Sequence, residues 1–240
     1  MTASGGEMSA TTGGDNPPFA CLAIEMSTSI SSIAVCVGAR VSSREYAGHP
    51  MQSRDIYTGV REVLIELNAE PEALDCIAFG CGPGAFTGLR VAAAVAQALA
   101  YGAGKPVARI SSLAALAAGA ARRHQVDCIA PCLDARMGEA YLAVYSGGLS
   151  GDWHEVVPDC LVDPEQVRLP AELQFLAAGP GWSAYPNLVD NHAAQISATN
   201  FSLVPSAVDV LDLAARQYHA NQTVAATDAL PNYIRNKVTD

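Results

Sequence analysis

Residues 78–102 read AFGCGPGAFTGLRVAAAVAQALAYG. An apolar run typical of a buried strand enters a glycine-proline turn, and the turn leads into an alanine-rich helix. The turn lacks the lysine of GxxxxGK[ST] and does not match GxGxxG with a following acid, so neither phosphate-binding motif is present. We therefore favour a structural turn that sets the start of the helix, formed by Gly82, Pro83, Gly84, Thr87 and Gly88.

The helix predicted over Thr87–Tyr101 is apolar on nearly all sides, with Thr87 as a possible cap. Its expected core face is formed by Leu89, Val91, Val95, Ala98 and Leu99. The opposite stripe, bordered by Ala93 and Ala100, carries little polarity and consists of Arg90, Ala94, Gln97 and Tyr101. A helix of this kind requires cover on two sides. Either the second half of the chain or another protein supplies the second cover.

Outward from this stretch, the predicted order is strand, strand, strand, helix, strand, helix, strand. The segments are 20–25, 32–37, 41–46, 55–67, 75–81, 87–101 and 106–110. Short turns between the first strands indicate antiparallel pairing. This is the element order of the ribonuclease H-like fold.

The second half begins in the same way, with apolar runs at 128–133 and 140–145, a third extended stretch at 153–158, and a last helix at 206–219 capped by Ser206. An α/β fold with two ribonuclease H-like units is the actin-like ATPase architecture, here with a second copy degraded by frequent prolines. We expect a flexible tail over 1–19, a first subdomain over 20–112, and a smaller second one over 113–240 whose end packs back on the first.

The 240 residues carry a net charge of −10, with 50% hydrophobic and 16% charged residues. This composition excludes a disordered chain and disfavours a nucleic-acid binder acting alone. No signal peptide and no membrane-spanning run are recognisable. The seven cysteines, without a CxxC motif, are expected to be reduced buried thiols of a cytoplasmic protein.

Two acids end corresponding strands, Glu25 before Met26-Ser27-Thr28 and Asp134 before a short turn. They could hold a phosphate and its Mg²⁺ or face each other as a carboxylate pair, but we favour turn formation. The five histidines include no pair at metal-binding spacing, and no GxSxG occurs. We therefore predict no catalytic residue, no cofactor and no metal.

Five motifs together resemble the TsaB (YeaZ) family over residues 22–238: FGCGPGAFTGLRVAAAVAQALAYG, ISSLAALA, LDARMGEAYLAVY, GPGWSAYPNL and LPNYIRNKV. The resemblance implies an actin-like fold and a non-catalytic subunit. Such a subunit binds TsaD as a heterodimer, is joined by TsaE, and is required for threonylcarbamoyl transfer to the adenosine next to the tRNA anticodon.

It also implies a homodimer of the isolated chain, and contact with tRNA through the complex. Docking is expected on helices at about 52–68 and 87–101, through Ile56, Val60, Arg90, Ala93, Ala94, Gln97 and Tyr101.

The sequence departs from the family pattern at two places. Glu25-Met26-Ser27 stands where the family has Asp-Thr-Ser or Asp-Thr-Ala, and Gln52-Ser53 replaces His-Ser or His-Thr. Both departures weaken nucleotide or metal binding by this chain. Two alternatives stay open: an actin-like phosphotransferase or ATPase, and a peptidase acting on TsaD-like proteins.

Overall fold

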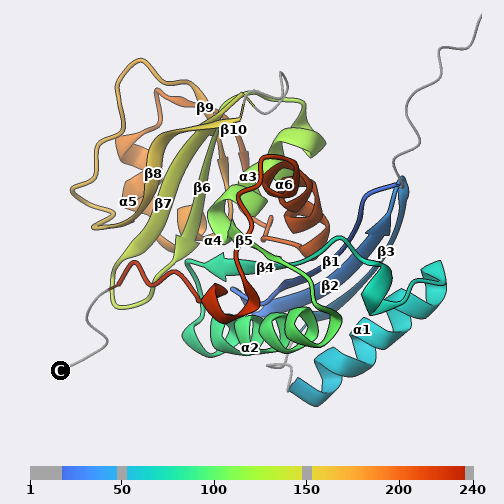
Figure 1. The fold of residues 1–240 in the computed structure, drawn as a ribbon. Coiled ribbons are helices and arrows are strands. Elements are labelled where there is room, and N and C mark those ends of the chain that lie inside the picture. The colour runs from blue at the N-terminus through green and yellow to red at the C-terminus, as the bar shows by residue number, and fades with distance from the viewer. Residues whose placement is uncertain (1–17, 48–52, 148–152, 236–240) are drawn as a thin grey trace, which may run out of the picture.

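The computed structural model describes residues 18–47, 53–147 and 153–235. The predicted tail lies almost wholly outside these residues, and so does Gln52. Two five-stranded mixed sheets lie on either side of a central pair of helices, and further helices cover their outer faces (Figure 1). This arrangement confirms the predicted actin-like fold class.

The first sheet has the strand order β3-β2-β1-β4-β5, in which β2 runs antiparallel to β1 and β3, while β4 and β5 are parallel to β1. Apart from the 3₁₀ turn η1, the sequence predicts these elements to within a few residues. They are β1 (Ala20–Glu25), β2 (Ile30–Val37), β3 (Arg40–Ala47), α1 (Ser53–Leu67), the 3₁₀ turn η1 (Pro71–Ala73), β4 (Cys76–Gly82), α2 (Phe86–Ala103) and β5 (Val107–Ser111).

The second sheet repeats this topology, because its order β8-β7-β6-β9-β10 has the same pairing directions. The second copy is reduced: no helix is present between β8 and β9 in the described chain, and two short helices stand in the place of α2. Its elements are α3 (Ser112–His124), β6 (Ile129–Asp134), β7 (Ala140–Ser146), β8 (His154–Val162), β9 (Phe175–Ala178), α4 (Pro180–Ala184), α5 (Pro186–Asn191), β10 (Ile196–Asn200), α6 (Ala207–His219) and η2 (Ala226–Asp228).

The first sheet buries different side chains on its two faces. Alternate residues of β1 such as Leu22 and Ile24 pack toward α1 and α2, whereas Cys21 and Ala23 pack toward α6. The small side chains on the second face allow α6 to approach the strands closely. A helix from the end of the chain thus completes the core of the first half.

The central helices α3 and α6 join the two halves. Apolar residues of α3 form a core with β6, β7 and β9, while α4 and α5 cover the other face of the second sheet. At the contact between the helices, the fully buried Asp209 of α6 accepts from Arg122 of α3 at 2.5 Å. Ser206 caps α6 as predicted, because its hydroxyl accepts from the backbone of Asp209.

The end of the chain returns to the first sheet as an extended segment. Val224 pairs with Val107 beside the edge strand β5, and η2 packs on α2. Residues 229–235, here called the C-terminal strap, then pass along the end of β4 and reach the hairpin between β6 and β7. Ala229 is buried in the same core as α1 and α2.

Some local predictions are wrong. The helix α2 begins at Phe86 with Ala85 as its cap residue, so Thr87 is the second helical residue and does not cap it. Ala98 is exposed rather than part of the core face. The helix α3 was not predicted, because its alanine-rich sequence is buried on most sides and gives little helical periodicity.

Candidate functional site

The glycine turn is packed against the chain's own first hairpin. The backbone N–H of Ala85 donates to the carbonyl oxygen of Ser27 at 2.7 Å. A Cβ placed on Gly84 would lie 2.5 Å from that oxygen, and one on Gly88 would lie 2.0 Å from the carbonyl oxygen of Met26. These two glycines therefore permit close contact between segments of the chain.

Glu25 lies fully buried behind this turn. Its carboxylate accepts from the backbone N–H of Ser27 at 2.6 Å and from the hydroxyl of Ser112 at 3.1 Å. A Cβ on Gly80 would lie 1.7 Å from its Oε2, so the carboxylate fills the space left by that glycine. Burial raises the pKa of Glu25, and the hydrogen bonds oppose this shift.

Asp134 occupies the corresponding position in the second half. Its Oδ1 accepts from the backbone N–H of Arg136 at 2.8 Å, two residues along, as Glu25 does from Ser27. The hydroxyl of Tyr185 also donates to Oδ1 at 2.7 Å. Each acid thus binds the turn that follows its own strand, which is the turn-forming arrangement favoured from the sequence.

The titratable groups of the described residues form no cluster suited to a metal ion, since no group of three or more His, Cys, Asp or Glu side chains is close enough. All seven cysteines are free. Burial raises the pKa of the Cys81 thiol to about 12, so this group is protonated near neutral pH. None of the described helices is long and apolar enough to cross a membrane.

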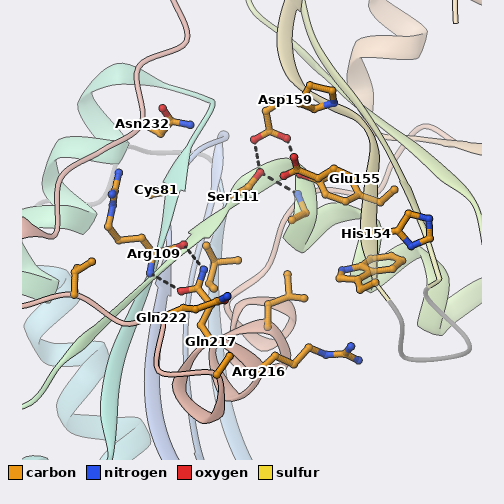
Figure 2. A pocket seen from close by; sticks show the side chains of 18 residues that line it. Cys81, Arg109, Ser111, His154, Glu155, Asp159, Arg216, Gln217, Gln222 and Asn232 are labelled. Atoms are coloured by element: carbon orange, nitrogen blue, oxygen red, sulfur yellow. Dashed lines mark hydrogen bonds between the residues drawn. The ribbon is translucent and has the colours of Figure 1, made fainter.

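A cleft of about 920 Å³ opens between the edge strands of the two sheets, β5 and β8 (Figure 2). At one end, Asp159 accepts from the hydroxyls of Ser111 at 2.5 Å and Tyr145 at 2.7 Å. Burial raises the pKa of Asp159, while the two hydroxyl donors lower it. Ser111 also caps α3 through the backbone N–H of Ala114, so its oxygen serves as a helix cap.

Sequence reasoning missed this cleft because its residues come from distant segments. Gln217 of α6 binds both the N–H and the carbonyl of Arg109 on the outer edge of β5, at 3.2 and 3.0 Å (Figure 2). The Ser111 cap before an alanine-rich run was the one local signal available. The position of Asp159 opposite that cap depends on the pairing of the second sheet.

The structure divides the predicted docking residues into exposed and buried ones. Arg90, Ala94 and Tyr101 are exposed on α2, and Gln97 is half-buried. Ile56, Val60 and Ala93 are buried in the core against the first sheet, so predicting them as contact residues was wrong. The spacing of these apolar residues marks the face by which each helix packs on the sheet.

The exposed side of α1 instead carries Tyr57 and Ile65, which are 44% and 62% exposed. They lie eight residues apart on the same helical stripe. Gly82, Pro83 and Gly84 form the end of β4 and the turn, whereas Thr87 and Gly88 lie within α2. The helices α1 and α2 lie side by side on the outer face of the first sheet (Figure 1).

Comparisons with known proteins agree with this fold. Residues 51–238 match the family model described as TsaD, tRNA N6-adenosine threonylcarbamoyltransferase. The chain is 31% identical to the tRNA threonylcarbamoyladenosine biosynthesis protein TsaB of Escherichia coli (strain K12), covering 90% of this chain and 95% of that one. It is 32% identical to TsaB of Haemophilus influenzae, covering 91% and 94%. The structure of YeaZ from Pseudomonas aeruginosa superimposes with a TM-score of 0.79 at 32% identity, covering 90% and 99%.

Proposed function

This chain belongs to the TsaB family, and we propose that it acts in tRNA threonylcarbamoyladenosine biosynthesis as a non-catalytic subunit that binds a TsaD-type partner. The exposed stripe of α2 is the observation that carries this proposal. Ala94, Ala98 and Gly102 follow one another at intervals of four residues and are all exposed. Beside them Tyr101 is 81% exposed, an unusual position for a large side chain.

Small residues on one helical stripe allow a second helix to approach closely. The side chains of Tyr57 and Ile65 on α1 and of Tyr101 on α2 would supply the apolar contact area around that stripe. We define the docking face by Tyr57, Ile65, Ala94, Ala98 and Tyr101. Ile56, Val60 and Ala93 support it from below without contacting the partner.

The turn and the two acids support the non-catalytic assignment. In a phosphate-binding loop, backbone N–H groups are left free to bind the ligand. Here Gly84 and Gly88 pack on Ser27 and Met26, and the Glu25 carboxylate packs on Gly80. The space beside the turn is therefore filled by the chain's own atoms. These contacts give no specific support to a phosphotransferase or a peptidase role.

The remaining partner assignments follow from the same proposal. TsaE joins the complex with TsaD, the isolated chain pairs with a second copy through the same face, and tRNA is bound through the complex in the cytoplasm. Of the sequence's 240 residues only 14 are Lys or Arg, against 24 Asp and Glu, so that tRNA affinity should come mainly from the partner.

The test is Ala94→Arg, which places a guanidinium in the middle of the docking face. If a partner helix packs there, the charge is buried without a counter-charge, and affinity for TsaD should fall by about 100-fold or more. Ala184→Arg, at an exposed position of α4 in the second half, is the matched control. Both variants should melt like the wild type. A normal melt with normal TsaD binding by Ala94→Arg would place the partner on another surface.

A further inference from the structure

The C-terminal strap brings an aromatic side chain to the first turn of α2. The rings of Phe86 and Tyr233 have centroids 5.5 Å apart. The guanidinium carbon of Arg90 lies 3.7 Å from the centre of the Phe86 ring, and its Nε donates to the hydroxyl of Tyr233 at 3.0 Å. We call Phe86, Arg90 and Tyr233 the arginine–aromatic cluster.

The strap is held in place by bonds to both halves of the molecule. The N–H of Asn232 donates to the carbonyl of Cys81 at 2.7 Å, and Arg109 donates to the carbonyl of Leu230 at 2.9 Å. At the far end Arg235 forms an ion pair with Glu139 at 2.5 Å. Figure 2 shows Asn232, Cys81 and Arg109 together at one end of the cleft. Because the backbone is anchored, presenting Tyr233 to a partner costs little ordering entropy.

The cluster is nevertheless open to solvent. Phe86 and Tyr233 are 41% and 42% exposed, and Leu230 of the same strap is 57% exposed. Within the described part of the chain, the contacts of Arg90 are to these two aromatic rings and include no carboxylate. A guanidinium has five N–H donors, and the bond to Tyr233 uses one of them. Its charge and most of its donors are therefore available to a partner.

The position of Arg90 makes the cluster continuous with the docking face. Arg90 lies one helical turn before Ala94, on the same exposed stripe of α2. From Phe86 to Tyr101 the helix extends about 22 Å, a length that a single partner helix can follow. Tyrosine, phenylalanine and arginine are enriched at protein interfaces, and an arginine fixed by aromatic rings is preorganised for bidentate binding.

We propose that the arginine–aromatic cluster is the end of the same interface and that Arg90 binds a carboxylate of the TsaD-type partner. This inference rests on the proposed function, and it adds the C-terminal strap and an acidic partner residue to the docking face. A nucleic-acid site is less favoured here because the cluster contributes one cation in a chain of net charge −10.

The experiment measures the affinity of the full-length chain for purified TsaD at several salt concentrations. Arg90→Gln should weaken binding about tenfold and reduce its dependence on salt, because one charge pair is lost. Tyr233→Ala should weaken binding similarly, whereas Tyr233→Phe, which keeps the ring, should lower the affinity for TsaD by about threefold. Arg168→Gln is the matched control, since Arg168 is exposed and donates to the backbone carbonyls of Glu165 and Val167.

The outcomes separate this inference from the proposed function. If Arg90→Gln binds like the wild type while Ala94→Arg fails to bind, the inference is overturned and the α1–α2 docking face stands. If Arg90→Gln is weakened while Ala94→Arg binds normally, the α1–α2 docking face is overturned, and with it the inference that the cluster is the end of that interface. If both bind normally, both are overturned. A loss of tRNA affinity by Arg90→Gln with unchanged TsaD affinity also overturns the inference.

Discussion

Asp209 allows the joining of the two halves to be tested by a matched pair of substitutions. Arg122 of α3 contacts two acids of α6 at 2.5 Å each, Asp209 and Asp212. The Asp209 side chain is fully buried and that of Asp212 is 56% exposed. Asp209→Ala and Asp212→Ala therefore remove the same kind of ion pair at opposite extremes of burial.

The expected cost of Asp209→Ala follows from its contacts. The carboxylate also accepts from the Ser206 hydroxyl at 2.7 Å, and it lies against Gly119, where a Cβ would be 2.4 Å from Oδ2. Removing one member of a buried ion pair costs about 3–5 kcal/mol of stability. Because the side chain of Arg122 is 44% exposed, we expect Asp209→Ala to cost about 3 kcal/mol. For a chain of this size, that loss corresponds to a fall in melting temperature of about 6–12 °C.

The assay is thermal and urea unfolding of both variants beside the wild type. Asp212→Ala should cost about 0.5 kcal/mol or less, as exposed ion pairs do. Because α6 completes the core of the first half, Asp209→Ala should shift a single transition that includes both sheets. Equal effects of the two substitutions, or the loss of one half while the other stays folded, would refute this account of the joining helices.

Two further predictions concern the glycine turn. Glu25→Gln removes the buried charge, while its amide oxygen can still accept from the Ser27 N–H and its amide nitrogen can donate to the Ser112 hydroxyl. Because the folded-state pKa of Glu25 is raised, its ionisation lowers the stability of the wild type as pH rises from about 4.5 toward that pKa, so the variant should melt above the wild type at pH 8 and equal it near pH 4. A variant that melts lower at pH 8 contradicts this. Gly88→Ala should lower the free energy of unfolding in urea by about 2 kcal/mol or more, because its Cβ would meet the carbonyl of Met26. Gly102→Ala, whose Cβ would have no atom within 4 Å, should raise the free energy of unfolding by about 0.5–1 kcal/mol through helix propensity. Equal effects of the two substitutions would show that the turn tolerates a side chain.

Most of the fold could be predicted from local sequence signals. The strands β1 and β2 are short, largely apolar runs separated by a small polar turn, and α1 has clear apolar spacing. The repeat could also be recognised, because Glu25 and Asp134 end corresponding strands before corresponding turns. These signals depend on neighbours along the chain, and a single sequence contains them.

The parts that could not be predicted depend on contacts between distant segments. The sequence of α6 predicts a helix, but its position on the first sheet follows from the small residues of strands far away, such as Cys21 and Ala23. On α1, by contrast, the apolar spacing already marks the face that meets the sheet, and the prediction of Ile56 and Val60 as contact residues did not use that signal. Ile56 and Val60 proved to be core residues, and Tyr57 and Ile65 took the exposed positions.

The cleft and the C-terminal strap show the same limit. Asp159 and Tyr145 come from the paired strands β8 and β7 and Ser111 from the end of β5, and no local motif encodes their meeting. The strap could be expected to be extended from its proline and polar residues. Its contact with Phe86 and Arg90 could not be expected, because it depends on the path of the chain after α6.

The central claim is that this chain enables a TsaD-type enzyme to act without performing the chemistry itself. The most direct measurement is a reconstituted threonylcarbamoyl transfer to tRNA, with TsaD, TsaE and a threonylcarbamoyl-adenylate donor supplied separately and this chain added or omitted. We expect modified tRNA when all are present, none when this chain is omitted, none from this chain alone, and a matching loss with Ala94→Arg. Modification of tRNA by this chain alone, or by TsaD and TsaE equally well without it, would contradict the account.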